Sequence, residues 1–390
     1  MHETQLSARA QAIVPSLIRE ASRYCTELGA LNLAQGLPDF AAPEFLKEAA
    51  RTAITQDHNQ YCDTWGLRPL REALAAKLQR DNKMVVDPET QITVCCGATE
   101  GLNLALMALL DPGDEVLVFS PFYENYRPNL AMVGAVARHI TLTGPGWEVT
   151  EEVLERGFAG KPPKVVIVNN PANPTGKVWT RPELELLARY CLHHGTYAIT
   201  DEIYEYIVYD GAEHISLASL PGMAERTITV NGFSKTFCVT GWRLGYTVAP
   251  AALSDGIRRL HDFLTICAPA PLQWAALAAV ESGEDYYHGL RSLYQAKRTL
   301  LFEALEKAGF APILPRGAYY IWTDGRVLGA ANACEAAHKL ATLAGIAAVP
   351  GDCFLPINQP NQNLRFCFAK RDETLQAAVH RLESLVALSS

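Results

Sequence analysis

The sequence predicts an α/β protein in which helices cover both faces of a mostly parallel sheet. Five short apolar runs alternate with helical segments, a pattern typical of such sheets. Strands buried on both faces are apolar nearly throughout, as residues 165–169 (VVIVN) are. Glycines and polar residues follow the ends of these runs, which is where open α/β sheets bind ligands. The predicted strands are 92–96, 115–119, 165–169, 197–200 and 227–230.

The composition is that of a globular protein and excludes several function classes. The chain has 390 residues, of which 49% are apolar and 19% charged, enough for a large domain and a smaller companion. The net charge of -8 argues against binding to nucleic acid or to an anionic membrane surface. The N-terminus lacks a signal-peptide core, and no apolar run approaches membrane-span length. We therefore expect a cytoplasmic protein.

The cysteine and histidine pattern predicts no metal site. Ten cysteines are scattered singly, apart from Cys95-Cys96, and no CxxC pair occurs. Without a secretory signal, free buried thiols are expected. Neighbouring residues on a helix face different ways, so His193 and His194 are not expected to share a metal ion.

Helical patterns outline the domain organisation. Helices are predicted over residues 5–28, 285–308 and 372–388, and the second of these leads from a large domain to a small one. No Gly/Ser-rich linker divides the chain, so we expect the two domains to pack closely. The predicted domains are a large one of residues 35–284 and a discontinuous small α+β domain of residues 1–34 plus 285–390.

The turn after the 92–96 strand has the features of an anion site. Gly97-Ala98-Thr99 leads into a helix predicted over 100–110, with Thr99 as the expected N-cap. Free N–H groups and the dipole at a helix N-terminus attract anions. Many such turns share this pattern, so the turn alone does not establish a phosphate site.

Side chains suited to a flat, charged ligand follow the later strands. Tyr123 follows the 115–119 run, where its ring can lie over a heteroaromatic ring or pack in the core. Asn173 lies in the rigid NPANPTG loop of residues 170–176. Asp201 comes at a strand end, where a carboxylate is costly unless it is paired or caps a helix.

The stretch TITVNGFSKTFCVTGWRLGY, residues 227–246, contains the most reactive candidate. Lys235 follows a strand and lies among small and apolar residues. A lysine amine is nucleophilic only when deprotonated, a state that a desolvated site near cations favours. The alternative is a solvated surface charge. Arg243 follows nearby and has the fork of donors that holds an anion.

The 170–176 loop, the DEIY sequence at 201–204 and the 227–246 stretch together resemble the fold-type-I, pyridoxal-phosphate-dependent aminotransferases of class I and II. The resemblance extends over nearly the whole chain and is closest to the branch with kynurenine, glutamine, methionine, aspartate and broad-specificity aminotransferases. It implies a mixed, mostly parallel sheet of the seven-stranded type between helices, with a smaller α+β domain. It also implies cis peptide bonds before Pro121 and Pro174.

The resemblance implies the cofactor pyridoxal 5'-phosphate and three catalytic residues. Lys235 would form the Schiff base with the cofactor aldehyde and serve as the acid and base of the reaction. Asp201 would keep the pyridine nitrogen protonated, and Tyr204 would hydrogen-bond the phenolic oxygen. The other implied cofactor contacts are Gly97, Ala98, Thr99 and Arg243 at the phosphate, Tyr123 over the ring and Asn173 at the phenolic oxygen.

Three further residues are implied to bind the substrate or a partner chain. Gly36, in the GLPDF segment, brings its backbone near the substrate carboxylate, beside Asn173. Arg365 would bind the α-carboxylate bidentately, although an arginine in a strand otherwise points to solvent. Tyr61 would reach the cofactor phosphate of a partner subunit, or it is a half-buried surface aromatic. The resemblance therefore implies a homodimer with its active site at the interface.

The implied activity is transfer of an α-amino group between an L-amino acid and a 2-oxo acid with ping-pong kinetics. Two features bear on the substrate: no second arginine for a dicarboxylate side chain is evident, and the apolar residues 263–271 favour aromatic or aliphatic donors. Gly232 also departs from the family, whose members often have a serine there.

A cysteine-S-conjugate β-lyase would use the same cofactor residues and stays open as an alternative. A DNA-binding regulator on this fold would need a module before residue 36, and a nicotinamide oxidoreductase would need GxGxxG; we find neither.

Overall fold

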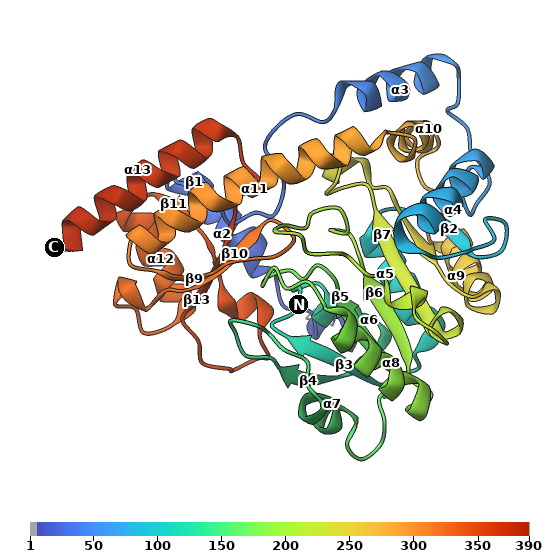
Figure 1. Cartoon of the computed structure of the whole chain (residues 1–390), viewed down its shortest axis with the longest axis horizontal. Coiled ribbons are helices and arrows are strands. Elements are labelled where there is room, and N and C mark those ends of the chain that lie inside the picture. Colours follow the sequence, from blue (N-terminus) through green and yellow to red (C-terminus); the bar gives the residue numbers. More distant parts are fainter. Residues whose placement is uncertain (1–5, 390) are drawn as a thin grey trace, which may run out of the picture.

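A seven-stranded mixed sheet forms the larger part of the protein (Figure 1). The computed structural model describes residues 6–389. The strand order is β2-β8-β7-β6-β5-β3-β4, and β8 alone runs antiparallel to both of its neighbours. This confirms the predicted fold class. The strands are β2 (Ile92–Cys95), β3 (Glu115–Ser120), β4 (Val136–Thr141), β5 (Val165–Asn169), β6 (Tyr197–Asp201), β7 (Thr227–Gly232) and β8 (Gly245–Val248).

Alternating side chains bury the two faces of this sheet under different helices. On β3, Val116 and Val118 face a core with α5, α6 and α9, whereas Leu117 and Phe119 face a core with α7 and α8. Both faces are therefore apolar, as a sheet enclosed by helices requires. These helices are α5 (Ala98–Leu109), α6 (Tyr126–Val133), α7 (Glu151–Phe158), α8 (Arg181–His194) and α9 (Ala251–Leu264).

Two strands of the large sheet carry no individual sequence prediction. β4, VARHIT, lies at the sheet edge and is mostly half-buried, so it lacks the apolar run of a central strand. β8, GYTV, is only four residues long and directly follows the turn that holds Arg243. Because glycine and threonine are also common in loops, the sequence does not distinguish this strand from the turn before it.

A third core lies beside the sheet, where α10 packs against α3 and α4. The described residues also include short 3-10 helices in the connections between elements. The three α-helices are α3 (Glu44–Thr55), α4 (Arg68–Asn82) and α10 (Ala270–Val280). The 3-10 helices are η1 (Leu217–Ser219), η2 (Ala224–Arg226), η3 (Thr240–Trp242), η4 (Arg326–Leu328) and η5 (Gly351–Phe354).

The prediction of one continuous helix over residues 5–28 is wrong. The structure has α1 (Ala8–Gln11) and α2 (Leu17–Glu27) with an irregular segment between them, and residue 5 lies outside the described residues. Pro15 has no N–H for a helical hydrogen bond, and the Ser16 hydroxyl accepts from the Arg19 N–H as a new N-cap. This break turns residues 12–19 into a separate segment that reaches the functional site.

The C-terminal part forms a second, smaller assembly around a sheet of order β12-β13-β10-β9 (Figure 1). A parallel pair, β1-β11, attaches the N-terminal segment to it, because Leu31 pairs with Ile346. The division at residues 34/35 and 284/285 stays a prediction. The strands are β1 (Leu31–Asn32), β9 (Ala311–Ile313), β10 (Tyr320–Asp324), β11 (Ile346–Ala347), β12 (Val349–Pro350) and β13 (Asn363–Cys367). The helices are α11 (Glu284–Lys307), α12 (Ala333–Leu343) and α13 (Asp372–Ser389).

The long helix α11 links the two assemblies and runs beside α13 (Figure 1). Its predicted bounds, like those of α13, agree with the structure to within one residue. Within residues 6–389, no helix has both the length and the apolar character that crossing a membrane requires.

Candidate active site

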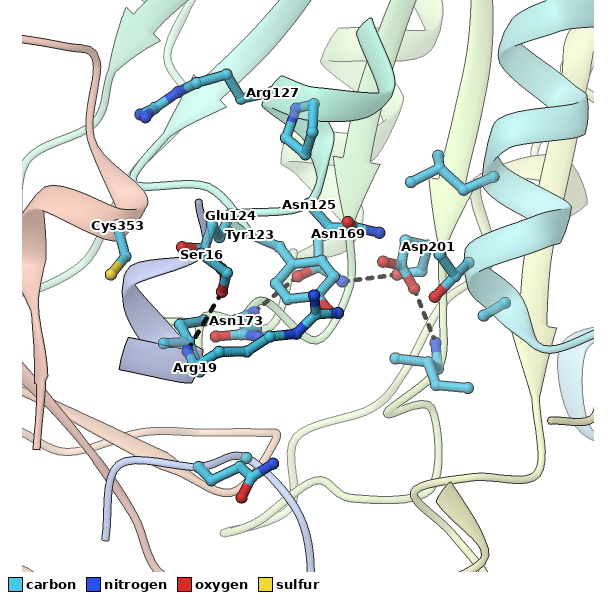
Figure 2. A pocket seen from close by; sticks show the side chains of 18 of the residues that line it. Ser16, Arg19, Tyr123, Glu124, Asn125, Arg127, Asn169, Asn173, Asp201 and Cys353 are labelled. Carbon is cyan, nitrogen blue, oxygen red and sulfur yellow. Dashed lines mark hydrogen bonds between the residues drawn. The ribbon is translucent and has the colours of Figure 1, made fainter. Parts of the chain in front are cut away.

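A cavity of about 650 Å³ opens at the carboxyl ends of the parallel strands and extends to the C-terminal assembly. Figure 2 shows side chains from several elements converging on it. Gly97 and Tyr61, although predicted, are not among its lining residues. The predicted residues that do line it are Gly36, Ala98, Thr99, Tyr123, Asn173, Asp201, Tyr204, Lys235, Arg243 and Arg365.

Lys235 lies just beyond β7 and points across the cavity. Its Nζ donates to the carbonyl oxygen of Gly36 at 3.1 Å. Burial is the main cause that lowers the pKa of Lys235 to about 8, while the Cys367 thiol and the Asp201 carboxylate act in the opposite direction. With a pKa of about 8, about a tenth of this amine is uncharged at pH 7, and the uncharged form is the one that acts as a nucleophile or base.

Asp201 ends β6 on the cavity floor and is buried. Burial raises the pKa of Asp201 to about 6, and the hydroxyl of Tyr126, which donates to Oδ2 at 2.8 Å, opposes that rise. The carboxylate is thus ionised near neutral pH and positioned to hold a cationic N–H. Sequence analysis missed Tyr126, because its contact with Asp201 spans 75 residues and no local pattern indicates it.

A group of tyrosines forms the wall beneath the Gly36 loop. The Tyr204 and Tyr320 hydroxyls lie 2.9 Å apart, and the Tyr319 hydroxyl donates to the Gly36 carbonyl at 3.1 Å. A Cβ at Gly36 would lie only 2.1 Å from the Tyr320 hydroxyl oxygen, so the loop can approach this wall only with glycine. Sequence analysis singled out Gly36 and Tyr204 but missed Tyr319 and Tyr320 as their partners.

Arg365 lies on β13 and is only 1% exposed, so the expectation that a strand arginine points to solvent is wrong here. Nη1 donates to Asn173 Oδ1 and Nη2 to the Ala34 carbonyl, each at 2.8 Å. The guanidinium lies over the Tyr320 ring and the Phe354 ring, 4.2 Å and 4.7 Å from their centroids. Among the described residues Nε has no hydrogen-bond partner, which leaves a buried donor for a ligand.

The turn after β2 brings a helix N-terminus and an arginine together. Gly97, with φ of +81°, caps α5, so the prediction of Thr99 as N-cap is wrong. The helical hydrogen bonds begin at Glu100, which leaves the Ala98 and Thr99 N–H groups ahead of them. A Cβ at Gly97 would lie 2.5 Å from Nη2 of Arg243, so glycine is required for this close approach.

Tyr123 and Tyr61 occupy different environments. Tyr123 lines the cavity, and its ring lies edge-on against Tyr126 at 5.6 Å. Tyr61 is 76% exposed and is not among the residues that line the cavity. Its predicted cross-subunit role stays a prediction. The peptide bonds before Pro121 and Pro174 are cis, as predicted, and so are those before Pro145 and Pro171.

Sequence analysis also missed residues 12–19, the irregular segment before α2 and the first residues of that helix, which line one side of the cavity. Glu124 holds this segment, because its carboxylate accepts from the Ser16 hydroxyl at 2.7 Å and the Leu17 N–H at 3.0 Å. Figure 2 shows Arg19 extending from this segment toward Tyr123. Only the tertiary structure reveals this arrangement, since more than 100 residues separate Ser16 from Glu124.

The fold and the cavity define a cofactor-dependent α/β transferase, with a lysine, an aspartate and two arginines converging on one site. Comparisons with known proteins identify it further. The family model "Aminotransferase class I and II" matches residues 29–382, and the chain belongs to this family. Its members depend on pyridoxal phosphate, which is accordingly the cofactor of this enzyme.

Individual relatives cover almost the whole chain. The probable N-succinyldiaminopimelate aminotransferase DapC of Mycobacterium tuberculosis is 36% identical, covering 97% of this chain and 98% of its own. The methionine aminotransferase of Escherichia coli is 34% identical, covering 95% and 96%. A solved N-succinyldiaminopimelate aminotransferase from M. tuberculosis superposes with a TM-score of 0.94 at 37% identity, covering 98% and 100%. All three are described as aminotransferases, so the comparisons do not support the β-lyase alternative.

The residues of the cavity fit pyridoxal phosphate on their own chemistry. Arg243 and the first N–H groups of α5 form a cationic cradle suited to a phosphate. Asp201 provides a buried carboxylate for a pyridinium N–H, and Lys235 provides an amine with a lowered pKa for an aldehyde. The cavity volume of about 650 Å³ also leaves room for a substrate beside the cofactor.

Proposed function

We propose that this enzyme transfers an α-amino group between an L-amino acid and a 2-oxo acid, with Lys235 as its central catalytic residue. One observation carries the proposal. Lys235, Asp201 and Arg365 come from separate parts of the chain and line the same cavity. An amine of lowered pKa, a buried carboxylate and a buried arginine are the set that this reaction needs.

The bound cofactor would supply an electron sink for the substrate's Cα–H bond. Arg365 would bind the α-carboxylate through both Nη atoms, exchanging its contacts with Asn173 and Ala34. Lys235 would hold the cofactor through Nζ and, once its amine is free, take the proton from Cα and return one to the product. Asp201, supported by the Tyr126 hydroxyl, would keep a proton on the pyridine nitrogen.

We propose a homodimer in which Tyr61 of one subunit completes the phosphate site of the other. Its exposure of 76% in the single chain leaves its hydroxyl available for such a contact. Tyr204 and Asn173 would bond the phenolic oxygen of the cofactor, and Tyr123 would lie over its ring. Gly36 would place its backbone beside the substrate carboxylate. We propose that the enzyme accepts a broad range of amino donors, which includes aromatic and aliphatic amino acids.

The test is a visible absorbance spectrum of the purified protein before and after single amino acids are added without a 2-oxo acid. A yellow band that bleaches for particular amino acids would support the proposal and rank the donors. Pyruvate and ammonia formed without a 2-oxo acid would instead indicate β-elimination. A protein that stays colourless when pyridoxal phosphate is supplied would overturn the role of Lys235.

A further inference from the structure

Lys370 is a buried lysine to which the proposed mechanism gives no role. It lies between β13 and α13 and is only 3% exposed. Its Nζ donates to the carbonyl oxygens of Gln35 and Leu37, at 3.1 Å and 3.0 Å. Among residues 6–389 the ammonium forms no ion pair with a carboxylate. Burying an ammonium is costly, so the two carbonyls are the groups that offset the cost here.

The two contacts bracket Gly36. The last residue of the segment 35–37 donates its N–H to the carbonyl of the first at 2.9 Å, which closes a tight turn, the Gly36 turn. The Gly36 carbonyl accepts from Nζ of Lys235 and from the Tyr319 hydroxyl, each at 3.1 Å. Because peptide units are planar and rigid, fixing the carbonyls on both sides restricts the direction of this one. Lys370 thus acts on the group that orients the Lys235 amine.

The same C-terminal segment also fixes the two ends of the loop that contains the Gly36 turn. Before the turn, Nη2 of Arg365 donates to the Ala34 carbonyl at 2.8 Å. After it, the Asp39 carboxylate accepts from the Arg371 N–H. Lys370 is the residue of this segment that holds the middle of the loop. One short stretch of chain therefore carries the proposed carboxylate-binding arginine and the anchors of the loop beside it.

We infer that Lys370 is a positioning residue, which holds the Gly36 turn so that its central carbonyl directs the Lys235 amine. This inference rests on the proposed function, because it takes Lys235 as the catalytic amine. Lys370 is not among the residues that line the cavity, so its effect passes through the turn. Among the residues that the structure describes, the Leu37 carbonyl accepts from Lys370 alone. Without the ammonium this end of the turn is released, and the amine loses its fixed acceptor.

The test compares Lys370→Met with Lys297→Met. Lys297, on α11, is also buried, at 5% exposed, but its ammonium pairs with Asp372 outside the turn. For the amino acid that bleaches the cofactor band best, kcat/KM should fall about 10- to 100-fold in Lys370→Met, since small displacements of a reacting group cost this much. In Lys297→Met it should stay within about twofold of the wild type, because the amine keeps its position. Equal losses in the two variants, or none in Lys370→Met, would overturn the inference.

A second readout separates the position of the amine from general damage to the site. When pyridoxal phosphate is added to the cofactor-free protein, the yellow band should form about tenfold more slowly in Lys370→Met. Pyridoxamine phosphate has no aldehyde and cannot bond covalently to Lys235. Its dissociation constant should therefore stay within about twofold, because the phosphate and ring contacts are unchanged. If pyridoxamine phosphate binds as poorly as the band forms slowly, the residue is merely structural and the inference is wrong.

A double variant tests whether Lys370 acts through the Gly36 carbonyl. Tyr319→Phe removes the other protein donor to this carbonyl. If both residues position the same group, their losses in kcat/KM will not multiply, and the double variant should fall short of the product by at least about threefold. Lys297→Met combined with Tyr319→Phe should give the product of the single losses. Multiplied losses in the Lys370 pair would contradict the inference.

A milder variant, Lys370→Gln, covers the case in which Lys370→Met does not fold. Glutamine keeps N–H donors on a shorter, uncharged side chain, so kcat/KM should fall by about three- to tenfold. Wild-type values in this variant, with the wild type itself bleached by amino acids, would leave the proposed function standing and refute the role of Lys370. If no amino acid bleaches the cofactor band of the wild type, the proposed function itself fails, and the inference fails with it.

Discussion

Nζ of Lys235 lies 3.1 Å from the carbonyl oxygen of Gly36, a residue 199 positions earlier in the chain. The contact joins the end of the seven-stranded sheet to the loop after β1, which itself pairs with β11 of the C-terminal part. The amine that we assign to catalysis is therefore oriented by both assemblies of the protein.

Lys235→Ala should abolish turnover and the covalent attachment of pyridoxal phosphate. After borohydride reduction, mass spectrometry should find the cofactor mass on the wild type and on the control Lys161→Ala, an exposed lysine. It should find none on Lys235→Ala, because no other lysine lines the cavity among the described residues. Retained turnover in the variant would refute the assigned role.

Arg365→Lys should mainly weaken binding of the amino acid. A lysine has a single ammonium in place of the planar fork, and one lost charge-assisted bond costs about 1.5–3 kcal/mol. We expect KM for the donor to rise about 10- to 100-fold while the dissociation constant of pyridoxal phosphate stays nearly unchanged. The exposed Arg371→Lys serves as control. A variant in which only cofactor binding changes would show that Arg365 has another role.

Asp201→Asn should stabilise the cofactor-free protein at neutral pH while it weakens cofactor binding. The folded-state pKa of Asp201, about 6, lies above its ordinary value of 3.8. As pH rises between these values the unfolded state loses its proton first, so this group's contribution to stability is present at low pH and lost toward pH 6. A shift of about two units corresponds to about 3 kcal/mol.

Urea unfolding of the cofactor-free proteins measures this effect. Asp201→Asn should exceed the wild type in free energy of unfolding by up to about 3 kcal/mol at pH 7.5, and the difference should shrink near pH 4. Asp262→Asn, an exposed position on α9, should show no such pH dependence. A difference that is the same at both pH values would contradict the burial of an ionised carboxylate.

Tyr61→Phe should raise the dissociation constant of pyridoxal phosphate several-fold, because the proposed hydrogen bond from its hydroxyl to the phosphate in the dimer would be lost. The control, Tyr190→Phe, removes a hydroxyl that donates to Glu151 outside the cavity. Unchanged cofactor affinity in Tyr61→Phe would remove the cross-subunit role. Sedimentation of both variants would show whether any effect arises from loss of the dimer.

Much of the site could be predicted because its chemistry follows strand ends, whose order in the chain is visible. Asp201 and Lys235 were found this way, and the sheet brings β6 and β7 side by side. The residues that hydrogen-bond to the site residues could not be predicted from strand ends. Tyr126 and Tyr320 carry no local signal, since their roles arise from contacts made across 75 and 116 residues.

Local rules also failed where tertiary contacts compete with them. A threonine is a better N-cap than most residues, yet α5 begins at Ala98 with Gly97 as its cap, at a position where Arg243 lies too close for a side chain. Helical periodicity joined residues 5–28 into one helix, but Pro15 and the Glu124 contacts divide it. Arg19 was overlooked for the same reason, because only this division turns it toward the cavity.

The place of β13 near the end of the element order has a consequence for synthesis of the protein. The ribosome releases all seven strands of the large sheet before it adds the strand that carries Arg365. A chain interrupted before β13 would contain Asp201 and Lys235 but would lack Arg365, which we propose as the residue that binds the α-carboxylate. If these roles hold, the capacity to bind a substrate arises late in translation, after the strands that lead to Asp201 and Lys235 have been made.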